Sequence, residues 1–162
     1  MLLCKPAELR ERVAEGRRLL GLDIGAKTVG LALSDTRWAI ASPLETIRRS
    51  RFRADAERLF AIVDEHGVGG LVLGLPINMD GSEGPRCQSV RQFAANLAER
   101  GLDLAVAFWD ERLSTAAVER LLITEADMTR KRRSEVVDKM AAAYILQGAL
   151  DALAAQRRTS ET

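Results

Sequence analysis

Aromatic residues, cysteine and histidine are scarce in this sequence. Its 162 residues include two tryptophans, one tyrosine and four phenylalanines, which make up 4% of the chain. RNA-recognition modules and single-strand-binding domains stack bases on aromatic rings, so the low aromatic content argues against both of these classes. Cys4 and Cys87 lie far apart and form neither a CxxC motif nor a zinc-binding spacing. His66 is the only histidine, which makes serine–histidine–acid catalysis hard to assemble.

Long hydrophobic segments and a strong overall charge are also missing. No apolar run approaches the ~20 residues needed to span a bilayer, and the N-terminal stretch lacks the apolar core of a secretory signal. We therefore expect no membrane association, and a cytoplasmic protein with two reduced thiols. The net charge is +1, so any attraction to phosphate depends on local patches. Two basic patches are present, at Arg48–Arg53 and Arg130–Arg133, although charge alone fits two solvated loops equally well.

Hydrophobic periodicity predicts one α/β domain over residues 1–162. Its core covers about residues 18–156, between a short leader without a clear packing face and a C-terminal tail. Three strands with short links, which implies antiparallel pairing, are expected at Leu19–Ile24, Thr28–Ser34 and Trp38–Ile47. Two further strands, Val68–Leu73 and Leu104–Trp109, each follow a helical pattern. The fold class is therefore a mixed five-stranded sheet, with three antiparallel strands, then helix-connected strands, and helices on both faces.

Glycine, proline and serine residues predict where the helices begin and end. The first runs from about Phe52 to a C-cap at Gly67, and the second begins at Pro85. Ser114 is expected to cap a short helix, and Ser134 a final long helix that follows a basic loop. The glycine-rich stretch 74–84 is not a Walker A motif. It either presents backbone donors and the start of the Pro85 helix to a phosphate or simply connects two elements.

Three acidic positions are the candidates for chemistry. Asp23 lies in an otherwise apolar strand, where a carboxylate is costly to bury unless it is paired, protonated or bound to a cation. Gly25 and Gly30 leave the backbone beside it open to a close-approaching ligand. Glu111 follows Asp110 at the end of another strand, where open α/β sheets bind ligands. Asp138 shares a stripe of small apolar residues on the last helix.

These three acids suit a divalent cation. Carboxylates from two strands and one helix match a site in which two Mg²⁺ or Mn²⁺ ions activate water and stabilise a leaving oxygen. Each acid also has a plainer interpretation. Asp23 would turn the chain, Glu111 would pair with Arg112 or cap the next helix, and Asp138 would favour a helix N-terminus. The basic segment before Asp138 favours a polyanionic substrate.

Four motifs together resemble the YqgF family of RNase H-like nucleases, also described as candidate Holliday junction resolvases. The resemblance covers about Leu19 to Asp151, in order. The matching stretches are Gly21-Leu22-Asp23-Ile24-Gly25-Ala26-Lys27 through Ser34-Asp35, Gly74-Leu75-Pro76 with Asn78-Met79-Asp80-Gly81, Asp110-Glu111-Arg112-Leu113-Ser114-Thr115, and Asp138-Lys139-Met140-Ala141-Ala142 through Ile145-Leu146-Gln147. One departure is Thr28, where many relatives are expected to carry arginine.

The resemblance implies an RNase H-like fold and a cytoplasmic bacterial nuclease that trims the 5′ end of precursor 16S ribosomal RNA. Asp23, Glu111 and Asp138 would be its catalytic and metal-binding acids. Phosphate contacts are expected from a basic set comprising Lys27, Arg112, Arg130, Lys131, Arg132 and Arg133.

Alternative functions remain open at this point. The same site would serve a resolvase of four-way DNA junctions, which a homodimer with paired sites would favour over a monomer. A non-catalytic nucleic-acid adaptor would keep the fold without hydrolysis. Asp23-Ile24-Gly25 also resembles a phosphate loop of the actin and sugar-kinase superfamily, although that architecture usually needs two such domains.

Overall fold

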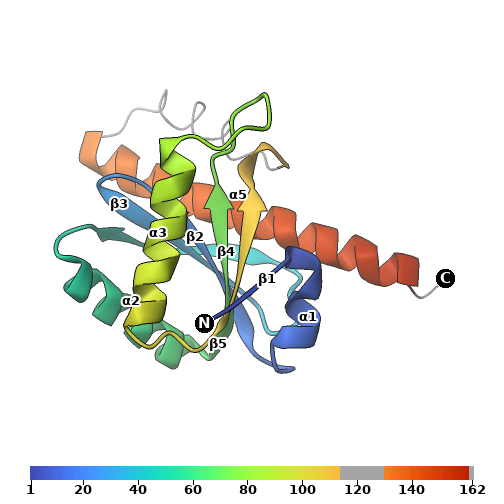
Figure 1. The fold of residues 1–162 in the computed structure, drawn as a ribbon. Helices are drawn as coiled ribbons and strands as arrows, with labels where there is room; N and C mark the ends of the chain where they lie inside the picture. Colours follow the sequence, from blue (N-terminus) through green and yellow to red (C-terminus); the bar gives the residue numbers. More distant parts are fainter. Residues whose placement is uncertain (114–129, 161–162) are drawn as a thin grey trace.

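A six-stranded mixed sheet forms the centre of the molecule. A computed structural model describes residues 1–113 and 130–160, and Figure 1 shows their arrangement. The strand order is β1-β6-β5-β2-β3-β4, with β2, β3 and β4 antiparallel and the pairs β2–β5, β5–β6 and β6–β1 parallel. The strands are β1 (Leu2–Cys4), β2 (Arg18–Ile24), β3 (Thr28–Ser34), β4 (Ala41–Arg48), β5 (Val68–Leu75) and β6 (Ala105–Asp110).

Helices cover both faces of this sheet. Residues of α2 and α3 pack on one face, in a core cluster with Leu22, Leu71 and Leu73. The long helix α5 and the short α1 pack on the other face, around Val72 and Trp109. In Figure 1, α3 crosses in front of the sheet and α5 runs behind it. The helical segments are η1 (Pro6–Glu8), α1 (Leu9–Arg12), α2 (Phe52–His66), α3 (Pro85–Glu99), η2 (Glu111–Leu113) and α5 (Arg130–Ser160).

The five predicted strands are all present, and the helix boundaries predicted at Gly67 and Pro85 are confirmed. The strand Thr28–Ser34 has the predicted bounds, and β2 and β5 differ from prediction by only one or two residues. Gly67 ends α2 with a φ of 64°, a left-handed conformation that glycine adopts without a Cβ penalty. Pro85 is the first residue of α3, where its fixed φ suits the first turn. The described part of the chain has no helix with the length and apolarity to cross a bilayer.

Three predictions about local structure are wrong. The leader is not unpacked, because its residues form β1 on the sheet edge and bury Leu9 completely. Trp38 does not start a strand. The Asp35 carboxylate accepts hydrogen bonds from the amides of Ala39 and Ile40, and Trp38 sits in this turn with a φ of 58°.

The last helix also begins earlier than predicted. It starts at Arg130, so the basic segment Arg130–Arg133 forms its first turn and is not a loop before a Ser134 cap. The short helix predicted from Ser114 lies outside the described residues.

Candidate active site

Asp23 projects from the sheet between two glycines. It is 5% exposed and pairs with Gly30 on the neighbouring strand β3. On the other side, Leu22 pairs with Leu73 of β5, so Asp23 lies beside Gly74. Laterally paired residues in a sheet point to the same face. The positions beside Asp23 on both neighbouring strands are therefore glycines.

Gly30 is where the backbone of α5 touches the sheet. A Cβ added to Gly30 would lie 2.0 Å from the carbonyl oxygen of Asp138 and 2.3 Å from its carbonyl carbon. Gly21 gives a second contact of this kind, because its added Cβ would lie 2.7 Å from the Leu146 Cβ. The prediction that Gly30 leaves room for a ligand is therefore wrong, since α5 occupies that space.

The Asp138 side chain is held by Thr28. The Thr28 hydroxyl donates a hydrogen bond of 2.5 Å to Asp138 Oδ2. Thr28 and Gly30 are two residues apart on β3, so both face α5. The Asp138 carboxylate thus lies along β3, on the same face of the sheet as Asp23.

Glu111 approaches from the opposite side, over β5. Its Oε1 lies 2.7 Å from the position of a Cβ added to Gly74, and its Cγ lies 3.1 Å from it. Its neighbours in sequence hold the backbone here, because the Asp110 carboxylate accepts hydrogen bonds from the Arg112 amide at 2.9 Å and from its guanidinium at 2.7 Å. The hydrogen bond from Arg112 lowers the pKa of Asp110 below its ordinary value.

The three predicted acids therefore lie on the same face of the sheet, the face covered by α5. Laterally neighbouring Cβ positions are about 5 Å apart. Glu111 Oε1 consequently lies within roughly 8 Å of the Asp23 Cβ, and the Asp138 carbonyl carbon within roughly 7 Å. Glycines beside Asp23 on the two neighbouring strands make this arrangement possible.

The donor set fits a hard cation. Carboxylate oxygens are the preferred ligands of Mg²⁺ and Mn²⁺, whereas a zinc site would need thiolate or imidazole groups. Cys87 and His66 could supply a thiolate and an imidazole, but Cys87 belongs to the core on the other face of the sheet and His66 ends α2. Within residues 1–113 and 130–160, no three His, Cys, Asp or Glu side chains already stand as one metal-binding group. Sharing an ion would thus require the three carboxylates to rotate toward one another.

The predicted phosphate-binding residues have different surroundings. Lys27 is exposed in the turn between β2 and β3, two residues beyond Gly25. Arg112 is engaged within the protein, because it binds Asp110 and donates to the Asn78 carbonyl oxygen at 3.4 Å. The remaining four are the first-turn residues Arg130, Lys131, Arg132 and Arg133 of α5, whose side chains lie outside the described part.

The glycine-rich stretch is a closed turn and not an open phosphate cradle. The Asn78 amide donates to Ser82 O, the Gly81 amide donates to Asn78 O, and the Ser82 amide donates to the Asp80 carboxylate. These three backbone donors are therefore already occupied. Met79 stands at the tip of the turn, 90% exposed.

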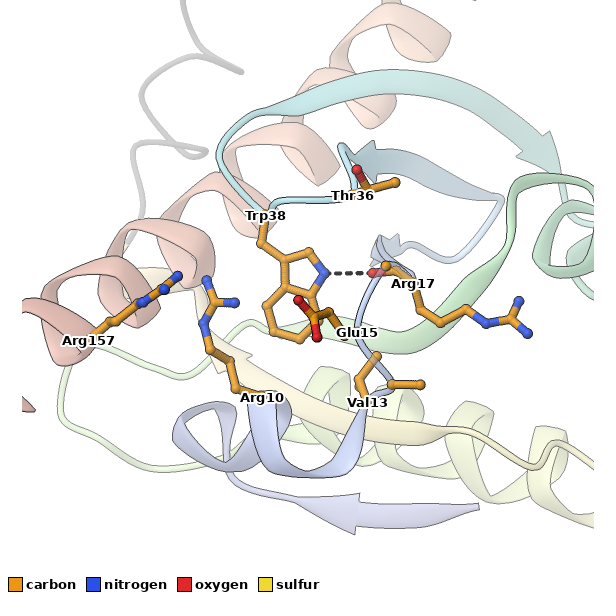
Figure 2. Close-up of a pocket in the computed structure, with 9 residues that line it drawn as sticks. Arg10, Val13, Glu15, Arg17, Thr36, Trp38 and Arg157 are labelled. Carbon is orange, nitrogen blue, oxygen red and sulfur yellow. Dashed lines mark hydrogen bonds between the residues drawn. The ribbon is translucent and has the colours of Figure 1, made fainter.

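A separate pocket lies at the opposite end of the sheet. It has a volume of about 280 Å³ and is lined by residues that precede β2 and follow β3, together with Arg10 and Arg157. In Figure 2, both of these arginines extend toward Trp38, whose indole N–H donates to the Arg17 carbonyl oxygen at 2.8 Å. None of the predicted site residues lines this pocket.

Sequence reasoning missed the contact of Gly21 and Gly30 with α5, the contact of Gly74 with Glu111, and the hydrogen bond from Thr28 to Asp138. A glycine inside a strand pattern marks a close approach of another backbone or a ligand, and Gly21, Gly30 and Gly74 all fit that rule. That signal identifies the positions but does not say which element approaches. Thr28 was noticed only as a departure from a family pattern.

Comparison with known proteins gives a consistent result. Residues 17–152 match the family profile of RuvX, described as a Holliday junction resolvase. A Paramagnetospirillum magneticum protein named as a candidate pre-16S rRNA nuclease is 66% identical over 93% of this chain and 96% of its own length. A Rhodospirillum rubrum protein of the same name is 57% identical over 97% of each chain.

A solved structure supports the fold. The yeast mitochondrial Holliday junction resolvase Ydc2 superposes with a TM-score of 0.52 at 12% identity, covering 93% of this chain and 84% of its own. The fold is therefore RNase H-like, as the motifs indicated, with one strand more than predicted.

Proposed function

The chain belongs to the RuvX family, also called YqgF, and from this membership we propose that it is a metal-dependent endonuclease acting on structured RNA. The observation that carries the proposal is the placement of Asp23, Glu111 and Asp138 on one face of the sheet, from three different elements. Carboxylates that converge on one site repel one another unless cations compensate their charge.

Asp23, Glu111 and Asp138 would hold Mg²⁺ or Mn²⁺, with two ions expected. Such ions, when bound, activate water and stabilise the leaving oxygen of a phosphodiester. The protein contributes the arrangement of the acids. Gly30 lets the backbone of α5 approach β3, Gly74 accommodates the side chain of Glu111, and Thr28 holds one oxygen of Asp138 in place.

Substrate binding is assigned to basic groups around the acids. Lys27 and the arginines and lysine of the first turn of α5 would attract a polyanion, and the partial positive charge of the helix N-terminus adds to this attraction. Arg112 would contribute charge there, while its hydrogen bonds to Asp110 keep the segment around Glu111 in place.

The natural substrate we favour is precursor 16S rRNA, cut near its 5′ end. The names of the similar proteins from P. magneticum and R. rubrum support this choice. We accordingly expect the protein in the cytoplasm, where precursor rRNA is made. Four-way DNA junctions are the second candidate substrate, favoured by the description of the family.

The decisive experiment offers both substrates side by side. Labelled precursor 16S rRNA and a four-way DNA junction are incubated with the protein, with and without Mg²⁺ or Mn²⁺, and the products are mapped. We expect metal-dependent cuts in the RNA. Symmetric nicks in the junction would instead favour a resolvase, and salt-sensitive binding without any product would identify an adaptor.

Asp23→Asn is the matching variant, with Asp64→Asn on the exposed surface of α2 as a control for loss of one charge. We expect Asp23→Asn to abolish cleavage while folding and RNA binding persist. Wild-type cleavage by Asp23→Asn, with Asp64→Asn behaving the same, would remove the proposed hydrolytic site. Sedimentation of the wild-type protein would decide between monomer and homodimer.

A further inference from the structure

The basic patch Arg48–Arg53 contains one arginine that is held differently from its neighbours. Arg48 pairs with Glu135 at 3.5 Å, and Arg53 pairs with Glu57 at 3.3 Å on the exposed surface of α2. Arg49 is half-buried, and its Nη1 donates a hydrogen bond of 2.7 Å to the Gly25 carbonyl oxygen. Arg49 is thus bound to the turn that follows Asp23.

Both the backbone and the side chain of Arg49 hold this turn. The Arg49 amide donates to the Lys27 carbonyl oxygen at 2.8 Å, and the Gly25 amide donates to the Thr28 carbonyl oxygen at 2.8 Å. Gly25 follows Asp23 by two residues, which corresponds to about 7 Å along a strand. The position of Arg49 is therefore coupled to the position of the carboxylate.

The guanidinium of Arg49 is fixed on its other side by aromatic rings. Its central carbon lies 5.4 Å from the centroid of the Phe93 ring, within cation–π range. Phe52 packs edge-on against that ring, with the centroids 5.4 Å apart. A guanidinium held between a carbonyl group and a fixed ring loses little further freedom when it binds an anion.

The charge of Arg49 has no carboxylate partner in the described ranges 1–113 and 130–160. A guanidinium carries five N–H donors, and only the one bonded to Gly25 has an acceptor in that part of the chain. A half-buried permanent cation with several open donors favours a bidentate anion such as a phosphate. Lys27, exposed in the same turn, adds a second positive charge.

We propose that Arg49 binds a backbone phosphate of the nucleic-acid substrate, next to the turn that carries Asp23, with Lys27 as its neighbour. This inference rests on the proposed function, because it assumes that a nucleic acid reaches this edge of the sheet. Arg49 thereby links substrate binding to the placement of the catalytic acid. Neither its position in the sequence nor its charge distinguishes it from Arg48 or Arg53.

The test measures binding without metal, so that no cleavage occurs. Fluorescein-labelled RNA from the 5′ region of precursor 16S rRNA is titrated in EDTA at several salt concentrations, with Arg49→Gln, Arg49→Lys and the control Arg53→Gln. We expect Arg49→Gln to weaken binding and to reduce the slope of log affinity against log salt by roughly 0.7–0.9, the contribution of one phosphate contact. Arg49→Lys should keep the wild-type slope because it keeps the charge, and Arg53→Gln should match wild type.

Three outcomes overturn the inference: an unchanged slope in Arg49→Gln, an equal loss of slope in Arg49→Lys, or an equal loss in Arg53→Gln. Thermal unfolding of each variant identifies changes in folding, and Arg49→Lys keeps the test valid if Arg49→Gln is unstable. The two proposals fail separately. If the wild-type protein never cuts RNA but its salt slope depends on Arg49, only the proposed nuclease activity is refuted. If the wild-type protein cuts RNA and Arg49→Gln keeps the wild-type slope, only the proposed Arg49 contact is refuted.

Discussion

Adding one methyl group at Gly30 and at Gly74 should separate the stability of the fold from the arrangement of the acids. At Gly30, the new Cβ would lie 2.0 Å from the carbonyl oxygen of Asp138, whereas ordinary contacts begin near 3.4 Å. The atom it meets is backbone, so strand or helix must move by more than 1 Å. The helix α5 cannot move without disturbing the packing of its own buried residues Ala141, Ile145 and Leu146.

Overpacking a core usually costs about 1–3 kcal/mol, and clashes with backbone cost more. We therefore expect Gly30→Ala to lower the free energy of unfolding by at least about 3 kcal/mol, since the gain of about 0.5–1 kcal/mol from replacing a strand glycine is smaller. Urea denaturation of Gly30→Ala and wild type measures this difference. Equal stability would refute the close seating of α5 on β3.

The nearest atoms that the Cβ of Gly74→Ala meets are side-chain atoms and not backbone. Its Cβ would lie 2.7 Å from Glu111 Oε1 and 2.6 Å from Ile145 Cδ1, and both groups can turn aside. We expect a loss of less than about 1.5 kcal/mol in stability, together with a large loss of cleavage because Glu111 is displaced. A folded Gly74→Ala protein that cuts at the wild-type rate would refute the place given to Glu111.

Three further predictions concern other groups. Thr28→Val should weaken Mn²⁺ binding several-fold in calorimetry, because Asp138 loses its hydrogen bond. Thr28→Ser keeps a hydroxyl and should bind Mn²⁺ as the wild type does, and equal affinities in all three proteins would contradict this prediction. Because Arg112 lowers the pKa of folded Asp110, the resulting stabilisation is present above the ordinary carboxyl pKa of about 4 and is lost at lower pH. The difference in unfolding free energy between wild type and Asp110→Asn should therefore shrink from pH 7 to pH 3, and a constant difference would count against the pairing. Burial raises the pKa of the Cys87 thiol. At pH 7.5, iodoacetamide should therefore label Cys87 more than about tenfold slower than free cysteine. Labelling of Cys87 in the folded protein at the rate of free cysteine would contradict this prediction.

Much of the sheet was predictable because its strands follow simple periodic patterns. Alternation along Thr28–Ser34 gave the strand its bounds, and Gly67 and Pro85 marked helix ends through their backbone preferences. The edge strand β1 was missed because three residues are too few to establish a period. Trp38 was misassigned because its neighbours are apolar, while the turn depends on the side chain of Asp35.

The sequence singles out the three candidate acids but not the residues that support them. Asp23 was conspicuous as a charge in an apolar strand, and Asp138 as a charge on an apolar stripe. The hydrogen bond from Thr28 to Asp138 joins residues 110 positions apart, and no local pattern reports such a contact. The hydrogen bonds from Arg112 to Asp110 and to the Asn78 carbonyl oxygen likewise depend on side-chain rotamers, which charge alone does not indicate.

Because α5 is the last element of the chain to be synthesised, its docking on the sheet affects how the protein folds during synthesis. Asp138 follows Asp23 by 115 residues, and ribosomes release the N-terminal part of a chain first. Until α5 emerges, the face carrying Val72 and Trp109 lacks its largest covering helix, and only two of the three acids exist. The chain thus completes its hydrophobic core and its set of carboxylates in one late step. A polypeptide cut short before Asp138 would lack both the packing of α5 and the third acid, so it would be an unstable protein and not an unregulated nuclease.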